Sequence, residues 1–278
     1  MKKLLHIGIF LCSLHTLVYG QTFQVATYNI RQRNQIDTGN LWVDRKDKVS
    51  ALITYHNFDI FGIQEAFKDQ MDDMHKLLPH YVSIGVGRDD GKEKGEYSAI
   101  FYKKERFNLI KNGTFWLSAT NTQSPNKGWD AVLPRICTWG IFEDKTNGKK
   151  FIFMNTHFDH RGKIARKESA KLILNKAKEL AQGMPLIICG DLNVNENNEA
   201  YFTLAKSSIV EDTFLRSNVV YAPNSSFNGW GKSIKETGRI DHIFISEPFQ
   251  VLKYGILTDT YMGKYPSDHF PVAVQLEW

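Results

Sequence analysis

Short polar segments stand at the ends of apolar, strand-like runs at six places in this 278-residue chain. One of them, PSDHFP (266–271), sets Asp268 beside His269 directly before the run PVAVQLEW. A carboxylate and an imidazole on one rim of a sheet can donate to a substrate phosphate or exchange protons with it. The other five segments are TYNIR (27–31), GIQE (62–65), NTHFDH (155–160), GDLN (190–193) and RIDHIF (239–244). One such loop is ordinary surface structure, whereas six on one chain predict a site.

The residues in these segments carry mostly oxygen donors. The amides and carboxylates are Asn29, Glu65, Asp191, Asn193 and Asp268. Hard oxygen ligands favour Mg²⁺, with Mn²⁺ as the alternative, and the sequence has no Cys/His spacing typical of a zinc site. Two imidazoles, His157 and His269, complete the set.

Each residue also has a purely structural explanation when it is taken alone. Glu65 could be an acid at a helix start, where the helix dipole favours it. Asp191 could belong to an Asx turn, because Gly-Asp-x-Asn suits that turn. Asn29 could cap its strand, and the histidines could be ordinary edge residues. The prediction of a site therefore depends on the whole ordered set.

In this order, the segments resemble one family, the endonuclease/exonuclease/phosphatase superfamily of metal-dependent phosphoesterases. Its members include deoxyribonuclease I, exonuclease III, the deadenylases, the neutral sphingomyelinases and the inositol polyphosphate 5-phosphatases. The resemblance extends from TYNIR to PSDHFP and so covers nearly all of residues 21–278. It implies a four-layered α/β/β/α sandwich.

The resemblance also implies a role for each residue. Glu65 resembles the principal ligand of the catalytic metal, with Asn29 beside it and Asp268 nearby. Asp191 resembles the base that orients and deprotonates the attacking water. Asn193 would steady this base and the phosphate.

The two histidines and three further residues are assigned in the same way. His157 and His269 resemble the imidazoles that hold the scissile phosphate, and each needs a carboxylate to fix its orientation. By similarity to the deoxyribonuclease I branch, Asp241 supports His269, and Glu96 supports His157. Arg135 resembles a phosphate-binding arginine of that branch; the alternative is a surface arginine at the start of a strand.

The choice among phosphoesters depends on weaker similarities. GDLN followed by Tyr201 and Leu204 resembles the deadenylase and nocturnin-like branch, and GRIDHIF stands where the 5-phosphatases carry WCDR. We therefore expect a secreted hydrolase of phosphodiester bonds in nucleic acid or nucleotide fragments. The same chemistry on a lipid or sugar phosphoester is the alternative. An inactive binding module is a third hypothesis, although it would be expected to lack one of the principal site residues.

Residues 1–20 have the pattern of a secretory signal peptide. Lys2 and Lys3 precede the apolar run 4–17, and Gly20 offers a cleavage point. The run is shorter than the ~20 apolar residues of a membrane anchor, whereas lipid modification of Cys12 is an alternative. We expect export to the periplasm or the exterior, no stable membrane insertion, and a monomer.

Residues 21–278 show no linker, repeat or low-complexity tract, so a single domain is predicted. The net charge of +5 includes the two lysines of the signal segment, and it is compatible with a polyanionic substrate. Cys137 and Cys189 each lie inside an apolar strand-like run. We expect them to be buried, unpaired thiols.

Hydrophobic periodicity predicts about a dozen strands and a few helices. The helices are expected over 44–57, 68–78, 164–181 and 201–207. Asp44 is the predicted N-cap of the first helix, and FNLIKN (107–112) and TFWLS (114–118) are predicted to be separate strands. Strands and helices do not alternate strictly enough for a doubly wound sheet. An α/β fold of two packed, mostly antiparallel sheets with outer helices is the prediction.

Overall fold

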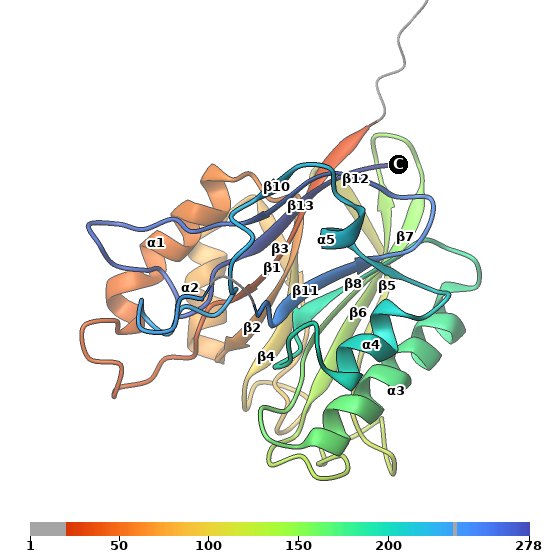
Figure 1. Cartoon of the computed structure of the whole chain (residues 1–278), viewed down its shortest axis with the longest axis horizontal. Coiled ribbons are helices and arrows are strands. Elements are labelled where there is room, and N and C mark those ends of the chain that lie inside the picture. The colour runs from red at the N-terminus through yellow and green to blue at the C-terminus, as the bar shows by residue number, and fades with distance from the viewer. Residues whose placement is uncertain (1–20, 236–237) are drawn as a thin grey trace, which may run out of the picture.

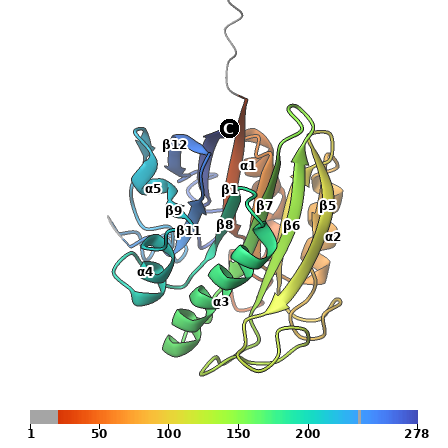
Figure 2. The ribbon, with the colours of Figure 1, turned by 90° about the vertical axis from the view of Figure 1, so that its right-hand side faces the viewer.

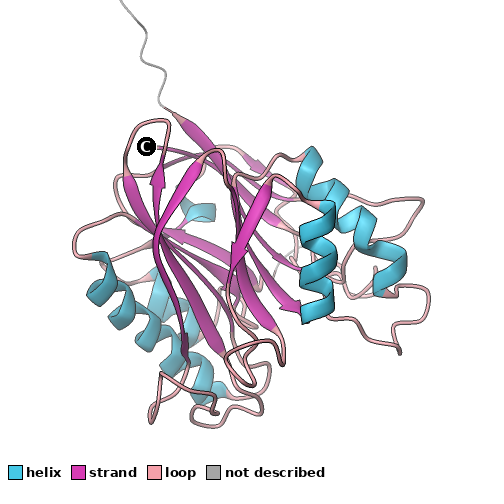
Figure 3. Ribbon diagram, turned by 180° about the vertical axis from the view of Figure 1, so that it is seen from behind, coloured by secondary structure: helices cyan, strands magenta, loops and turns pink. Residues whose placement is uncertain are grey.

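The computed structural model of this chain describes residues 21–235 and 238–278. Two β-sheets pack face to face, and helices cover the outer face of each one (Figures 1 and 2). Viewed from behind, the helices again form two groups on opposite sides of the sheets (Figure 3). The predicted four-layered α/β/β/α sandwich is confirmed. The segment interpreted as a signal peptide lies outside the described residues.

The first sheet has seven strands. Their order is β10 (Val220–Tyr221), β12 (Gln250–Ile256), β13 (Val272–Glu277), β1 (Thr22–Asn29), β2 (Ile60–Ala66), β4 (Tyr97–Lys103) and β3 (Tyr81–Ile84). The β10–β12 and β1–β2 pairs are parallel, and the other neighbours are antiparallel.

The second sheet has six strands. Their order is β5 (Phe107–Trp116), β6 (Ile136–Asp144), β7 (Lys150–His157), β8 (Leu186–Asp191), β11 (Asp241–Ile245) and β9 (Glu211–Asp212). The β7–β8 pair is parallel, and the other neighbours are antiparallel. Both sheets are thus mostly antiparallel, as the sequence predicted.

Three hydrophobic clusters hold the layers together. The cluster between the sheets is rich in buried aromatic rings: Phe23, Phe107, Phe142, Phe151 and Phe249. Helices α1 (Trp42–Tyr55) and α2 (Lys68–Leu77) bury an apolar face on the first sheet. Helices α3 (Lys163–Ala181) and α4 (Glu199–Ala205) do the same on the second, and the short α5 (Thr213–Arg216) lies beside β9, β11 and β12. Removal of this apolar surface from water is the main driving force for the assembly.

Two local predictions are wrong. Helix α1 begins at Trp42 with Leu41 as its N-cap, so Asp44 lies in the first turn and not at the cap. An acid in either position is favoured by the helix dipole, which is why the sequence did not distinguish them. The two strands expected on either side of Gly113 are one strand, β5, because the Trp139 ring of β6 packs over this glycine.

A buried polar network joins the two sheets beneath the end of β2. The Gln64 amide donates to Asn155 Oδ1 at 2.7 Å and to Thr27 Oγ1 at 3.0 Å. The Asn155 amide in turn donates to the Ile63 carbonyl at 2.9 Å. Gly62 leaves room for Asn155, since a Cβ there would overlap the Asn155 amide. Buried polar groups with satisfied partners fix the relative position of the elements that carry them.

Cys137 and Cys189 are buried and form no disulfide, as predicted. Within residues 21–235 and 238–278, none of the helices has both the length and the apolar character needed to cross a bilayer.

Candidate active site

Three adjacent strands of the second sheet place three polar residues in one row. Residue 157 ends β7 and lies opposite residue 191 at the end of β8, which in turn lies opposite residue 241 at the start of β11. The strand register alone therefore brings His157, Asp191 and Asp241 together. All three side chains are buried.

Two residues of the first sheet face this row from across the sandwich. Asn29, the last residue of β1, donates its amide to Asp191 Oδ2 and to Glu65 Oε1, both at 3.0 Å. Glu65 lies at a bulge in β2 and has a φ of 70°. A bulge re-aims a side chain, and here it turns Glu65 toward Asn29.

Two more residues of this group have a strained backbone. Arg31 and Asn193 also have positive φ angles, of 57° and 52°. A non-glycine residue in this region costs of order 1–3 kcal/mol and persists only where the surroundings hold it. Here the Arg31 N–H donates to Asn29 Oδ1 at 3.0 Å, and the Asn193 N–H donates to Asp191 Oδ1 at 2.8 Å.

Asp268 forms a pair of neighbouring carboxylates with Glu65. Arg31 contacts both, with Nη1 3.8 Å from Glu65 Oε2 and Nε 3.7 Å from Asp268 Oδ2. Burial and the charge of Glu65 raise the pKa of Asp268, against the opposing effect of His269. Burial also disfavours the charge of Glu65, but the Asn29 hydrogen bond and His269 outweigh it and lower the pKa of Glu65.

The donor chemistry of this pair fits a hard divalent cation. Glu65, Asp268 and Asn29 offer carboxylate and amide oxygens, which are the ligands that Mg²⁺ prefers. A second cluster, formed by Asp191, Asp241 and His269, also has ligand atoms within 4.8 Å of one another. Its imidazole is already hydrogen-bonded to one of its carboxylates. The first group supplies oxygen donors alone and is therefore the better candidate for a hard cation.

His269 is held by Asp241. Its Nδ1 lies 2.9 Å from Asp241 Oδ2, and its Nε2 lies 3.9 Å from Asp191 Oδ2. Burial opposes a charge on the ring, but the surrounding carboxylates, Asp241 foremost, outweigh it and raise the pKa of His269 to about 10. His269 is therefore a protonated donor at neutral pH.

Asp191 has a carboxyl group that titrates near neutrality. Burial and the charge of Asp241 raise its pKa to about 7, although His269 and the hydrogen bond from Asn29 act in the opposite direction. A carboxylate with a pKa near the working pH suits general base catalysis, because it accepts a proton readily and still exists in its basic form.

His157 differs from His269 in its charge. Asn193 Nδ2 lies 3.0 Å from His157 Nε2 and donates to it, which makes this ring nitrogen an acceptor. Burial, together with the charges of Arg135 and Arg88, lowers the pKa of His157 well below its usual value. The site thus combines one neutral and one charged imidazole.

Glu96 lies near His157, but its main partner is another residue. Its Oε2 is 3.7 Å from His157 Nδ1, which is too long for a hydrogen bond. Arg88 instead holds the carboxylate in a bidentate pair at 2.6 and 3.0 Å. Burial raises the pKa of Glu96 to about 7, against the lowering effect of Arg88.

Arg135 is buried at the start of β6, so it is not the surface arginine of the alternative. Its Nη2 lies 3.1 Å from His160 Nδ1, and its Nε lies 3.5 Å from Asp159 Oδ2. Among the described residues, no hydrogen-bond acceptor is available to its buried Nη1. Because a buried donor without a partner is costly, and because Arg135 lines the cleft, its guanidinium is suited to binding an anion there.

These side chains surround one cleft of about 620 Å³. Of the ten residues predicted from the sequence, Asn29 and Asp241 lie behind the lining, and the other eight form part of it. The lining also contains residues to which the sequence assigned no role: Arg31, Gln32, Asp37, Leu133, His160, Phe227, Gly229, Trp230 and Ile240.

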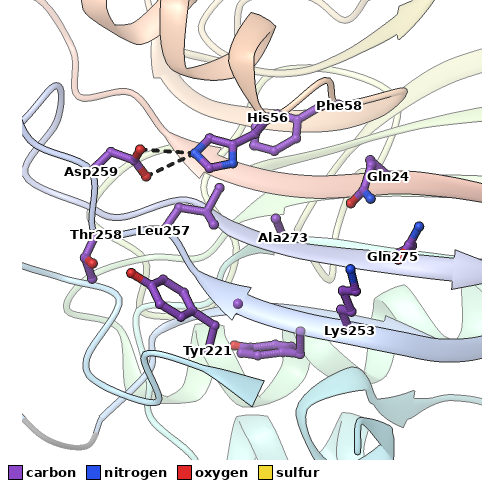
Figure 4. A pocket seen from close by; sticks show the side chains of 12 residues that line it. Gln24, His56, Phe58, Tyr221, Lys253, Leu257, Thr258, Asp259, Ala273 and Gln275 are labelled. Atoms are coloured by element: carbon purple, nitrogen blue, oxygen red, sulfur yellow. Dashed lines mark hydrogen bonds and ion pairs between the residues drawn. The ribbon is translucent and has the colours of Figure 1, made fainter. Parts of the chain in front are cut away.

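A second cavity, of about 440 Å³, lies on the outer face of the seven-stranded sheet (Figure 4). Tyr221, Lys253 and Gln275 line it, and His56 pairs with Asp259 at 3.1 Å at one side. It shares no lining residue with the cleft. The residues predicted to do chemistry therefore gather in the cleft and not here.

Arg45 supports the cleft from behind and was not predicted. Its fully buried guanidinium donates to the backbone carbonyls of Ile30, of Arg31 at 2.6 Å and of Pro266 at 3.1 Å. It thereby ties the segment after β1 to the PSDHFP segment. The sequence holds a signal for it, since Arg45 lies four residues before Val49 on the apolar face of α1.

A two-sheet sandwich with carboxylates, amides and two imidazoles at one edge is the architecture of a metal-dependent phosphoesterase. The chain belongs to the endonuclease/exonuclease/phosphatase family, whose sequence profile matches residues 26–269. The membership predicted from the sequence is confirmed. Members of this family are hydrolases that act on phosphoester bonds, and they depend on a divalent metal.

Two solved structures from Bacteroides thetaiotaomicron are similar to the whole described chain. One is a mannosyl-6-phosphatase, 47% identical, with a TM-score of 0.89; the match covers 92% of this chain and 100% of that one. The other is described as an endonuclease/exonuclease/phosphatase family protein, 46% identical, also with a TM-score of 0.89; the match covers 93% of this chain and 98% of that one.

Curated relatives are more distant. Human nocturnin is 24% identical over 262 residues, which are 84% of this chain and 57% of nocturnin. The nocturnins of Xenopus laevis and Mus musculus are covered over 64% and 40% of their length. The chain thus spans roughly half the length of the curated relatives it matches.

Proposed function

We propose that this chain is an exported sugar phosphatase, which hydrolyses the terminal phosphate from a phosphorylated sugar. The single observation that carries this proposal is the 47% identity to a mannosyl-6-phosphatase over the full length of that protein. Among the phosphoesters that the sequence left open, a sugar phosphoester was the alternative to nucleic acid. The similarity to the mannosyl-6-phosphatase favours the sugar phosphoester over nucleic acid.

The cleft offers donors for a terminal phosphate group. Such a group carries close to two negative charges at neutral pH and three strong acceptor oxygens. The protonated His269 and the guanidinium of Arg135 supply positive charge, and Asn193 lines the same cleft. Charge-assisted hydrogen bonds of this type are about twice as strong as neutral ones.

Asp191 is the proposed base. Its Oδ2 lies 3.9 Å from His269 Nε2 and 3.5 Å from His157 Nε2. A water molecule next to this carboxylate would therefore lie close to a phosphate bound by the two histidines. Asp191 takes the proton as the water oxygen attacks phosphorus. The bond to the sugar oxygen breaks, and this oxygen takes up a proton from solvent and leaves as the sugar hydroxyl group. His269 then stabilises the charge that gathers on the phosphoryl oxygens, an effect worth roughly 2.7–4 kcal/mol for one donor.

Glu65, Asp268 and Asn29 are the proposed holders of the metal, which we expect to be Mg²⁺, with Mn²⁺ as the alternative. When bound, the cation would act as a Lewis acid on the phosphate. Arg31 already contacts both carboxylates of this group at 3.7 and 3.8 Å. Arg31 therefore provides a positive charge next to the two acids even without a metal.

A phosphodiester of nucleic acid or of a nucleotide is the second candidate substrate. The observation in its favour is the similarity to nocturnin and to the exoribonuclease Ccr4 of Mycosarcoma maydis, which is 22% identical over 298 residues. An inactive binding module is disfavoured, because Glu65, His157 and His269 all line the same cleft as Asp191.

We propose export and the absence of stable membrane insertion from the sequence pattern of residues 1–20. A monomer of one domain is the accompanying proposal. Mass spectrometry of the secreted protein tests the location directly: the N-terminus should lie near Gln21.

A substrate panel tests the chemistry. Mannose 6-phosphate, single-stranded DNA, RNA, sphingomyelin and bis-(p-nitrophenyl) phosphate would each be incubated with Mg²⁺, with Mn²⁺ and with chelator. We expect phosphate release from mannose 6-phosphate that exceeds turnover of every diester and that stops with chelator. Preferential cleavage of RNA or DNA would instead support the second candidate.

A further inference from the structure

Trp230 lies in the wall of the catalytic cleft, and the hydrolysis step makes no use of it. Its half-buried side chain lines the same cleft as Gly229, Gln32 and the Arg31–Asp37 pair. That pair is bidentate, with Arg31 Nε 2.9 Å from Asp37 Oδ2 and Nη2 3.2 Å from Asp37 Oδ1. The cleft thus contains an indole ring together with the fixed, planar ion pair of Arg31 and Asp37.

The chain holds Trp230 in an unfavourable backbone conformation. Its φ is 60°, between Gly229 and Gly231, whose φ angles are 53° and 83°. A left-handed conformation costs a non-glycine residue roughly 1–2 kcal/mol, so the two glycines are expected in this turn and the tryptophan is not. Strain of this kind is concentrated at ligand-binding positions.

A buried asparagine secures the turn to the catalytic segment. Asn228 Oδ1 accepts from the Trp230 N–H at 2.8 Å, and the Asn228 amide donates to the Ser267 carbonyl at 3.1 Å. The N–H groups of Asn228 and Gly229 donate to the Asp268 carbonyl at 2.8 and 3.0 Å. The position of the indole is therefore fixed relative to His269, the next residue.

The orientation of the ring is fixed as well. The guanidinium of Arg45 lies 5.3 Å from the ring centroid of Trp230 and 5.1 Å from that of Trp42. Arg45 is fully buried and cannot move away without breaking its bonds to backbone carbonyls. One face of the Trp230 indole is thus occupied by this cation.

We propose that Trp230 is the platform on which the sugar ring of the substrate stacks while its phosphate is hydrolysed. This inference rests on the proposed function and specifies the part of the cleft that recognises the sugar. The apolar C–H face of a pyranose packs on an aromatic ring, and its hydroxyl groups reach the polar side chains around it. Arg31, Asp37 and Gln32 line the same cleft and are the residues that would bind these hydroxyl groups. Pockets that combine a large apolar surface with a few fixed polar groups recognise small ligands in this way.

Trp230→Ala is the test, with Trp230→Phe as the conservative variant, which retains an aromatic face. We expect Trp230→Ala to raise KM for mannose 6-phosphate on the order of tenfold, a loss of about 1.4 kcal/mol, with a much smaller change in kcat. For ethyl phosphate, which has no ring, the rise in KM should be much smaller. Trp230→Phe should recover most of the affinity. Tyr221→Ala removes an exposed aromatic side chain from the second cavity and controls for the loss of a surface ring.

The results separate this inference from the function on which it rests. Equal losses on both esters, or no change in KM, would overturn the platform while leaving a sugar phosphatase in place. A wild-type protein that ignores mannose 6-phosphate would overturn both. A 5′-nucleotide is the third substrate to be tested. If Trp230→Ala raises KM for this substrate alone, the ring stacks on a base, and the inference of a sugar platform is wrong.

Discussion

Removal of Asp241 should disable the same step as removal of His269. The two side chains are buried, and Asp241 Oδ2 accepts from His269 Nδ1 at 2.9 Å. Burial alone would lower the pKa of His269, and Asp241 is the foremost of the groups that raise it to about 10. Without Asp241, the ring loses the hydrogen bond that orients it and the foremost of the groups that favour its charge. Loss of one donor to the developing charge costs roughly 10²–10³ in kcat, and we expect this range for either single variant.

The combination of variants distinguishes a joint role from two separate ones. Residues that act as a unit are strongly non-additive, so His269→Ala/Asp241→Ala should be hardly slower than the slower single variant. His157→Ala removes a different contact, and its combination with Asp241→Ala should come closer to the product of the two losses. The assay is kcat/KM for phosphate release by wild type, the three single variants and both double variants. Thermal unfolding is followed in parallel.

Asp241→Asn is the matched control, because it preserves the volume of the side chain and removes the charge. Its melting temperature should stay nearer to that of wild type than the melting temperature of Asp241→Ala, while its activity falls almost as far. The reasoning is refuted if His269→Ala keeps near-wild-type rates. A fully multiplicative His269→Ala/Asp241→Ala variant would refute it as well.

Three other perturbations test the framework around the site. Gly62→Ala should lower the free energy of unfolding by about 1–3 kcal/mol in urea titration, because the new methyl group overlaps the Asn155 amide; unchanged stability would contradict the network between the sheets. Burial opposes the charge of Asp212, but Arg239 outweighs it at 2.9 Å and lowers the pKa of Asp212. The carboxylate therefore stabilises the fold above its ordinary pKa of about 3.9 and loses this effect as the pH falls through the lowered value, so Asp212→Asn should cost more stability at pH 7 than at pH 3. Glu65→Gln should raise the Mg²⁺ concentration needed for half-maximal rate without changing the melting temperature of the metal-free protein; outright unfolding would show that Glu65 is structural.

The sequence predicted the layers and the gathering of the polar residues because both are encoded locally. Alternating apolar residues define the strands, and polar residues at strand ends share one edge of the sandwich once the strands pair. His157, Asp191 and Asp241 illustrate this, since their alignment follows directly from the register of β7, β8 and β11. The glutamate of GIQE was equally visible as a residue type. The direction of its side chain could not be predicted, because this direction depends on a bulge in β2.

The residues that the sequence did not reveal act through contacts that form only in the folded chain. Arg88 holds the Glu96 carboxylate, although the sequence assigned Glu96 to His157. Arg45 lies 221 residues from Pro266, whose carbonyl it binds. Trp230 is placed by a strained turn that contacts the PSDHFP segment. Such contacts depend on tertiary packing, and neither residue type nor periodicity encodes them.

Asp191→Asn gives the most direct test of the central claim, that this cleft hydrolyses a sugar phosphate with Asp191 as the base. The measurement is phosphate release from mannose 6-phosphate with Mg²⁺ by wild type and by the variant, both shown to be folded. Loss of a general base typically costs on the order of 10²–10⁴ in rate. We predict clear turnover by wild type and a decline of this size in Asp191→Asn. Equal rates for the two proteins would contradict the account.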